Sequence, residues 1–284
     1  MPKIKYTSAK GLVQSSGAKE VVLQGAFLKC TDVATDAWGA VKPVMIPGLH
    51  KNLKVFNLDA HTGMHEAVFG NVGANTHIFE TDTDNSSAVA ALANDADFTD
   101  GALTLKTGNS SGNQTCLSTA AIPFKCVAGK QWWIETAFKL DDHDVVEFFF
   151  GLTERATDVN DFHTTAAGSG TDRVGFVKKA HNVDAVEFAV THNAAGTVGT
   201  GLDTGITYAA DNQILSLGIH WDGTKINFYT DSVTTGTTPG NLVLNTSFND
   251  AVPSDAGMRL VLLVVSANNV ETATINYLRG AYEV

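Results

Sequence analysis

The sequence predicts an all-β sandwich or barrel, and three observations support this prediction. Short stretches in which apolar and polar residues alternate recur from about residue 52 to the C-terminus. Clusters of glycine, asparagine, threonine and serine separate these stretches, and such residues favour turns. Hydrophobic residues make up 44% of the chain and charged residues 17%, which is typical of a packed globular protein.

Residues 1–50 differ from the rest and are expected to form an extended arm with one or two strands. The segment is rich in glycine, serine and alanine, and its short apolar patches do not continue over three helical turns. Such an arm is too thin to bury a core alone, so it needs its own domain, a sister subunit or a larger surface to lie on. The residues expected to make this contact are Val21, Val22, Leu23, Phe27, Leu28 and Trp38.

Residues 51–284 hold the expected strands of the sandwich. The strongest candidates are WWIETAFKL (132–140), VVEFFFGLTE (145–154) and the long final stretch ETATINYLRGAYEV (271–284). The apolar run LVLLVV (260–265) fits a buried strand. One short helix is expected in the alanine-rich stretch 87–98, with Ser86 or Ser87 as its N-cap.

The stretch SLGIHWDGTKINFYTDS (216–232) predicts a β-hairpin. Two apolar, alternating runs flank Asp222-Gly223, a pair that favours a tight turn with positive φ. Ile226 and Phe228 are expected to face the core, with Trp221 either beside them or exposed. Lys225, Asn227 and Tyr229 should lie on the opposite face.

The net charge and the lack of a signal-peptide pattern or long apolar run argue against several classes of protein. The formal net charge is −11, and the 19 basic residues form no stripe, so we expect no nucleic-acid partner. The N-terminus has no apolar signal region and no run approaches the length of a membrane span. We therefore expect synthesis in the cytoplasm and no membrane contact. Cys30, Cys116 and Cys126 form no metal or redox motif and are expected to be buried apolar filler.

Two of these stretches carry a resemblance to a known superfamily. LSLGIHWDGTKINFYTDS (215–232) resembles the hairpin of concanavalin A-like lectin/glucanase jelly rolls, in which a strand ending in Trp-Asp-Gly leads into the next strand. GKQWWIETAFKLDDHDVVEFFFGLTE (129–154) is similar to a strand pair of the same superfamily. The resemblance covers roughly residues 52–284, and it implies a concanavalin A-like jelly-roll β-sandwich preceded by the arm.

The combination of features also resembles the virion proteins of tailed bacteriophages. These proteins join a Gly/Ser-rich N-terminal arm to a lectin-like jelly roll, start at an unprocessed methionine, and are acidic with few cysteines. The resemblance implies a non-enzymatic capsid decoration (cement) protein on the capsid surface. Its partners would be the major capsid protein and copies of itself, with a trimer as the first guess. The alternatives are a carbohydrate-binding module of a head fibre or tail and, third, a glycoside hydrolase.

The glycoside hydrolase alternative requires two carboxylates beside a cleft. The nearest motif is ETDTDN, where Glu80, Asp82 and Asp84 would share one face of a strand. Its third acid is aspartate rather than glutamate, and the motif runs directly into a turn. We therefore expect no catalytic residue in this chain.

Two groups were weighed as metal ligands. Asp95, Asp97 and Asp100 supply hard oxygen ligands suited to Ca²⁺, although ordinary turn chemistry explains them equally well. His61 and His65 lie four residues apart, but Gly63 interrupts the turn and no second metal-binding motif follows. The expectation is that the protein has no cofactor, with calcium as the weak alternative.

Glycan binding requires an exposed aromatic side chain with polar neighbours. The candidates are Trp132, Trp221 and Tyr229. Trp132 and Trp133 are adjacent in one predicted strand and must face opposite sides of the sheet. The alternative is that the outward tryptophan meets another subunit or the arm.

Overall fold

The computed structural model describes most of the sandwich and two short parts of the N-terminal segment. The described residues are 3–7, 11–16, 53–59, 79–83, 90–93, 98, 102–119, 123–154, 172–178, 185–192, 196–198, 203–208, 210–233, 242–250, 252–266 and 269–283. In these ranges the regular elements are all strands. No helix long and apolar enough to cross a bilayer occurs among them.

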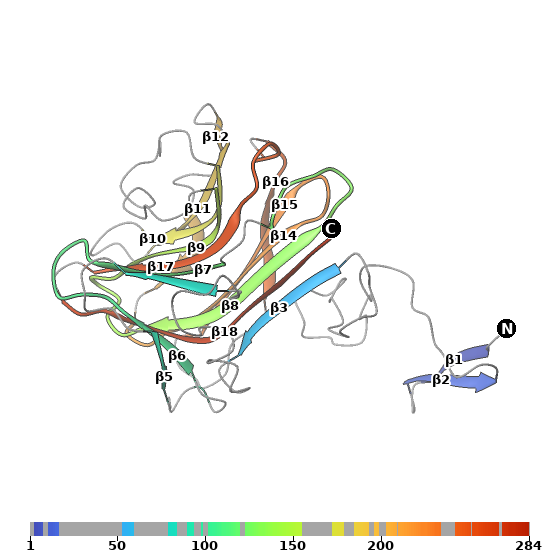
Figure 1. Cartoon of the computed structure of the whole chain (residues 1–284), viewed down its shortest axis with the longest axis horizontal. Helices are drawn as coiled ribbons and strands as arrows, with labels where there is room; N and C mark the ends of the chain where they lie inside the picture. Colours follow the sequence, from blue (N-terminus) through green and yellow to red (C-terminus); the bar gives the residue numbers. More distant parts are fainter. Residues whose placement is uncertain are drawn as a thin grey trace.

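Two large antiparallel sheets make up the body of the molecule (Figure 1). Sheet I contains β4 (Phe79–Thr83), β7 (Gln114–Thr119), β9 (Glu147–Thr153), β10 (Arg173–Lys178), β11 (Ala185–His192), β12 (Gly196–Val198), β13 (Asp203–Thr207) and β17 (Arg259–Val265). Sheet II contains β3 (Leu53–Asp59), β5 (Ala90–Ala93), β6 (Ala102–Lys106), β8 (Trp132–Leu140), β14 (Ile214–Trp221), β15 (Ile226–Val233), β16 (Val243–Phe248) and β18 (Thr272–Glu283).

The strand order confirms the jelly-roll prediction. Sheet I runs β12-β11-β10-β9-β17-β7-β4, with β13 also paired to β11. Sheet II runs β16-β15-β14-β8-β18-β6-β5, with β3 also paired to β18. The chain passes repeatedly from one sheet to the other, as from β6 to β7, β8 to β9 and β16 to β17. The chain therefore folds as an all-β, concanavalin A-like jelly-roll sandwich.

The core lies between the two sheets and is built from alternating inward residues of both. Phe138 of β8 meets Phe148 of β9 edge to face, with ring centroids 5.2 Å apart. Phe176 of β10 and Phe228 of β15 make a second such pair at 5.1 Å. Edge-to-face packing places the positive ring edge on the negative face, which adds to the free energy of burial. These pairs fix the two sheets against each other.

The run 260–265 forms β17, and this strand is buried on both faces, as its sequence predicts. Leu260, Leu262 and Val264 point into the core, whereas Leu263 packs on the outer face of sheet I with Phe149. A central strand with apolar residues on both sides leaves no polar alternation, which explains the unbroken apolar run.

The N-terminal segment contributes β1 (Lys3–Thr7) and β2 (Gly11–Ser16), which pair as an antiparallel hairpin. This two-stranded sheet is separate from sheets I and II and lies apart from them in Figure 1. Residues 21–38, including the expected contact residues, lie outside the described part of the chain.

The predicted helix over 87–98 is wrong in the part that the structure describes. Residues 90–93 form β5, which pairs with Ala102–Leu105 of β6. Alanine favours helices only by tenths of a kcal/mol over most residues, so pairing with a neighbouring strand decides the conformation. Three further strands were not predicted, because they lie in stretches expected to be turns or left without a prediction: β12, β13 and β16.

The predicted hairpin is confirmed as β14 and β15, paired from Ile214↔Val233 to Trp221↔Ile226. Gly223 adopts φ 95°, the positive value that favours glycine. Asp222 closes the turn through its carboxylate Oδ1, which accepts hydrogen bonds from the backbone N–H groups of Thr224 and Lys225, both at 2.9 Å. The aspartate therefore acts as a side-chain acceptor in the turn.

Candidate functional site

The candidate site is the outer face of sheet II, the face turned away from the core. Residues that alternate with the core positions place their side chains there. The cross-strand row Tyr229–Gly218–Glu135–Arg279 runs across β15, β14, β8 and β18. Tyr277 lies one outward position before Arg279 on β18, so aromatic and charged groups share this face.

An ion pair forms the centre of this face. The guanidinium Nε of Arg279 donates to the carboxylate Oε1 of Glu135. The same guanidinium lies over the ring of Tyr277, with Cζ 4.3 Å from the ring centroid, which is a cation–π contact. The side chain of Glu135 is 5% exposed and that of Arg279 is 39% exposed. Arg279 thus presents part of a fixed, planar donor group to the outside.

The environment of Tyr277 changes its acidity. Burial raises the pKa of the Tyr277 hydroxyl, and the nearby Glu135 carboxylate raises it further, while Arg279 lowers it. The phenol is therefore neutral at physiological pH and can both donate and accept hydrogen bonds.

Other side chains cover the two ends of this face and leave its middle half-exposed. Trp133 is only 4% exposed and packs with Leu242 and Ala281. At the other end, Lys139 lies over the ring of Phe98, with Nζ 5.5 Å from the centroid. Between these ends, Tyr229, Asp231, Tyr277 and Arg279 are partly exposed, and small residues occupy positions 137 and 218.

The structure corrects two of the three expected glycan-facing residues. Trp132 and Trp221 face each other across β8 and β14, and both belong to the core, at 1% and 4% exposure. Trp132 packs edge to face with Phe124, and the indole N–H of Trp221 donates to the carbonyl of Val127 at 3.1 Å. Neither ring is available to a sugar. Tyr229 lies on the outer face of sheet II, and the tryptophan on this face is Trp133 rather than Trp132.

The acidic motif considered for catalysis lies at the edge of sheet I. Glu80 and Asp82 are on β4, opposite Ser118 and Cys116 of β7, and Asp84 lies outside the described residues. The outward Glu147 of β9 is three strands away, because the order is β9-β17-β7-β4. Strands about 4.8 Å apart place these backbones roughly 14 Å apart. This separation of the backbones exceeds the distance of about 5–9.5 Å between paired glycosidase carboxylates.

The outer face of sheet I is covered by apolar packing. Cys116, Phe149, Val177, Val261, Leu263 and Val265 form a second buried cluster there. Glu147 lies beside it, and burial raises the pKa of its carboxyl to about 7, although the charge of Lys178 lowers it. This face therefore offers no open acidic cleft within the described residues. Cys126 is also buried, as expected, and burial raises the pKa of its thiol to about 12.

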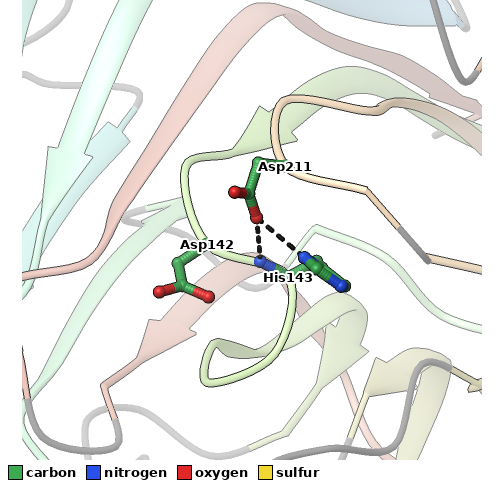
Figure 2. A group of neighbouring side chains, drawn as sticks. All are labelled: Asp142, His143 and Asp211. Carbon is green, nitrogen blue, oxygen red and sulfur yellow. Dashed lines mark hydrogen bonds and ion pairs between the residues drawn. The ribbon is translucent and has the colours of Figure 1, made fainter.

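The candidate metal ligands of the sequence, His61, His65, Asp95, Asp97 and Asp100, lie outside the described residues. The structure instead brings together Asp142, His143 and Asp211, whose ligand atoms all lie within 4.8 Å of one another (Figure 2). The run DDHD at 141–144 was the visible sequence signal for this group. Asp211 could not be found in this way, because it lies 68 residues further along the chain.

Comparison with known proteins supports the fold. No protein-family model matches the chain, and no curated protein matches it in sequence. Among solved structures, a protein of unknown function from Shewanella oneidensis MR-1 is similar with a TM-score of 0.54 and 12% identity, over 83% of this chain and 88% of that one. Peanut lectin is similar with a TM-score of 0.50 and 10% identity, over 81% and 97%. Both similarities concern the sandwich, which is thus a lectin-like fold.

Proposed function

We propose that this chain is a non-enzymatic, lectin-like module that binds carbohydrate on the outer face of sheet II. The observation that carries the proposal is the group of Arg279 and Tyr277, both partly exposed, held by the buried Glu135. An arginine held by an ion pair and an aromatic ring is fixed before a ligand arrives, so binding costs little conformational entropy.

The chemistry of this group suits a sugar. Sugar hydroxyls both donate and accept hydrogen bonds, and the guanidinium offers donors in a rigid plane. Asp231 and Tyr229 lie on β15, three strands from β18 and so roughly 14 Å away across the sheet, a distance that an oligosaccharide can span. Over this span Asp231 supplies an acceptor, and the rings of Tyr229 and Tyr277 offer apolar surface for the C–H groups of successive sugar rings. A few fixed polar groups beside aromatic surface are the usual composition of a small-molecule site.

The test of this proposal is a glycan array probed with the purified full-length protein. We expect binding to a limited set of glycans that the free oligosaccharide competes away. Absence of binding to any glycan would contradict the proposal, and release of shortened sugars from a bound glycan would contradict its non-enzymatic part.

As a second function we propose attachment to a tailed-phage particle through the N-terminal arm. The specific observation in its favour is the β1–β2 hairpin, which forms a sheet separate from the sandwich. An isolated two-stranded hairpin is at best marginally stable in water, so it gains stability from a surface on which it can lie. The major capsid protein is the proposed surface, and copies of this chain, a trimer first, would add avidity.

Deletion of residues 1–48 tests the attachment. We expect the truncated chain to keep the circular dichroism spectrum of the sandwich but to lose co-sedimentation with purified particles that lack it. Full binding by the truncated chain would contradict the proposal. The copy number per particle, measured against the major capsid protein by mass spectrometry, would separate a decoration protein from a fibre or tail module.

A further inference from the structure

A cluster of acidic residues and one histidine lies at one end of the sandwich, away from the candidate sugar face. It is formed by the connection that follows β8, by the connection that precedes β14, and by the residue before β18. Its members are Asp141, Asp142, His143, Asp144, Asp211 and Glu271. These segments meet because β14 and β18 both pair with β8.

The two connections are held together by buried hydrogen bonds. The hydroxyl of Tyr208 accepts from the backbone N–H of Leu140 at 2.7 Å and donates to its carbonyl at 2.9 Å. The backbone N–H of Asn212 donates to the same carbonyl at 2.8 Å, with Asn212 at φ 59°. The turn that carries Asp211 therefore has a fixed position relative to Asp142 and His143.

Asp211 contacts His143 directly, and the carboxylate of Asp142 lies to one side of this pair (Figure 2). The Asp211 Oδ1 atom lies 2.7 Å from His143 Nδ1 and accepts the backbone N–H of His143 at 3.0 Å. The Asp142 Oδ1 atom accepts the backbone N–H of Asp144 at 3.1 Å, which orients the carboxylate. Donor atoms within 4.8 Å of one another need only small side-chain rotations to surround an ion at about 2.0–2.2 Å.

A buried carboxyl group beside the cluster is a second observation in favour of a cation. Glu271 is 1% exposed, and its Oε1 atom has no hydrogen-bond partner among the described residues. Its carboxyl lies within hydrogen-bonding reach of Asp141 and in the field of Asp142 and Asp211. A buried acceptor without a partner destabilises the folded state, and a cation would remove this cost.

Among the described residues of the cluster, His143 is the one basic group, with its Nε2 atom 3.1 Å from Asp144 Oδ1 and its Nδ1 atom 2.7 Å from Asp211 Oδ1. In the described part of the chain, no lysine or arginine forms an ion pair with Asp141, Asp142, Asp144, Asp211 or Glu271. Like charges in close proximity oppose one another unless a proton or a cation lies between them.

We propose that Asp142, His143 and Asp211, with Glu271 behind them, bind a divalent transition-metal cation. The imidazole decides the class of ion, because nitrogen ligands suit zinc, nickel and similar ions, whereas Ca²⁺ takes oxygen ligands. The ion takes the place of the proton shared between Nδ1 of His143 and Asp211, and that proton leaves to solvent. By linking two connections, the ion stabilises this end of the sandwich.

The experiment measures binding of Zn²⁺, Mn²⁺ and Ca²⁺ to the full-length protein by calorimetry and by the midpoint of thermal unfolding, Tm. We expect Zn²⁺ at a hundredfold excess over its Kd to raise Tm by about 5 °C or more. Asp211→Asn and Glu271→Gln should each weaken binding by at least about tenfold. The matched control is Asp250→Asn, an exposed aspartate that is not part of the cluster and should leave the shift intact.

Three outcomes would overturn the proposal. Absence of any Tm shift and of any binding heat would exclude the site. A Zn²⁺ shift that survives Asp211→Asn would place the ion elsewhere, for example on another histidine. A shift with Ca²⁺ alone would exclude the transition-metal class. None of these results depends on whether the protein binds carbohydrate.

Discussion

The hydroxyl of Tyr208 makes both of its hydrogen bonds to one residue, Leu140, at the end of β8. Tyr208 is fully buried, and burial raises the pKa of its hydroxyl, so the group stays neutral. The carbonyl of Leu140 has a second donor in Asn212, whereas the N–H group of Leu140 depends on the tyrosine hydroxyl. The hydroxyl of Tyr208 and the backbone of Asn212 therefore both link the end of β8 to the segment before β14.

Tyr208→Phe should lower the free energy of unfolding by about 1–3 kcal/mol, because it leaves the buried N–H group of Leu140 without an acceptor. Urea denaturation measures the loss. Tyr282→Phe is the control, since Tyr282 is half-buried and its ring packs against Phe124 without a hydrogen bond to the hydroxyl. Equal stability of the two variants would contradict this account of Tyr208.

Two buried titratable groups should make the free energy of unfolding change with pH in opposite directions. Burial raises the pKa of Glu147 from 4.5 to about 7, so the folded protein binds a proton that the unfolded chain releases. Its contribution to stability therefore falls as pH rises from 4.5 to 7. Burial lowers the pKa of His220 from 6.5 to about 4, so here the unfolded chain binds the extra proton. Its contribution rises between pH 4 and 6.5.

Glu147→Gln should reduce the downward component of the stability–pH curve, to which Glu271, whose carboxyl pKa burial also raises to about 7, contributes as well. His220→Gln should reduce the upward component. Each group contributes a slope of at most about 1.4 kcal/mol per pH unit. Urea denaturation at half-unit steps from pH 4 to 8 measures both. If both variants keep the wild-type profile, neither group has the protonation state described here.

Among the elements, the β9–β10 pair depends on two glycines opposite each other. Gly151 and Gly175 are register partners, and the backbones approach so closely that neither position has room for a side chain. A Cβ atom on Gly175 would lie 2.6 Å from the carbonyl oxygen of Phe150 and 2.7 Å from the ring of Phe149. The strand spacing and the outer cluster of sheet I therefore both require glycine here.

Gly151→Ala should reduce the free energy of unfolding by about 1–3 kcal/mol or more, because the added methyl group meets the backbone of Val174 and Gly175. Gly112→Ala is the matched control. Gly112 has φ 81° and open space around it. Alanine there costs only the strain of a side chain at positive φ, which is about 1–2 kcal/mol. A larger loss at Gly112 than at Gly151 would contradict the close approach of the two strands.

The strands that the sequence predicts well have either a strong apolar period, such as β8, β14, β15 and β18, or a continuous apolar run, such as β9 and β17. In β8 the adjacent Trp132 and Trp133 are equally apolar, but Trp132 shares the period of Ile134 and Phe138. The structure places Trp132 in the core, opposite Trp221 of β14. Strand β5 was predicted as a helix because its alanines carry no β-period, and its partner strand decides its conformation.

The candidate site could be predicted only in part, for a similar reason. The alternation of the hairpin places Tyr229 on the outer face. Glu135 is an isolated acid in the alternation of β8, and its partner Arg279 lies 144 residues away and becomes its neighbour only through the β8–β18 pairing. Contacts between distant segments depend on strand order, and strand order does not follow from local pattern.

At the scale of the whole molecule, the sandwich presents one covered outer face and one that is partly open. The outer face of sheet I is occupied by buried apolar residues, whereas that of sheet II keeps Arg279 and Tyr277 partly exposed between two covered ends. The proposed binding role of sheet II and the proposed attachment through the N-terminal hairpin would place separate tasks in separate parts of the chain.

The central claim is tested most directly by the Kd of Arg279→Lys for the glycan that binds best on the array. Lysine keeps the positive charge beside the buried Glu135 but lacks the planar donor group. The claim predicts at least about tenfold weaker binding, or 1.4 kcal/mol. The same substitution on the opposite sheet, Arg259→Lys, should leave the Kd unchanged. Equal affinity of folded Arg279→Lys and wild-type protein would show that sugar binds elsewhere, and would contradict the assignment of this face.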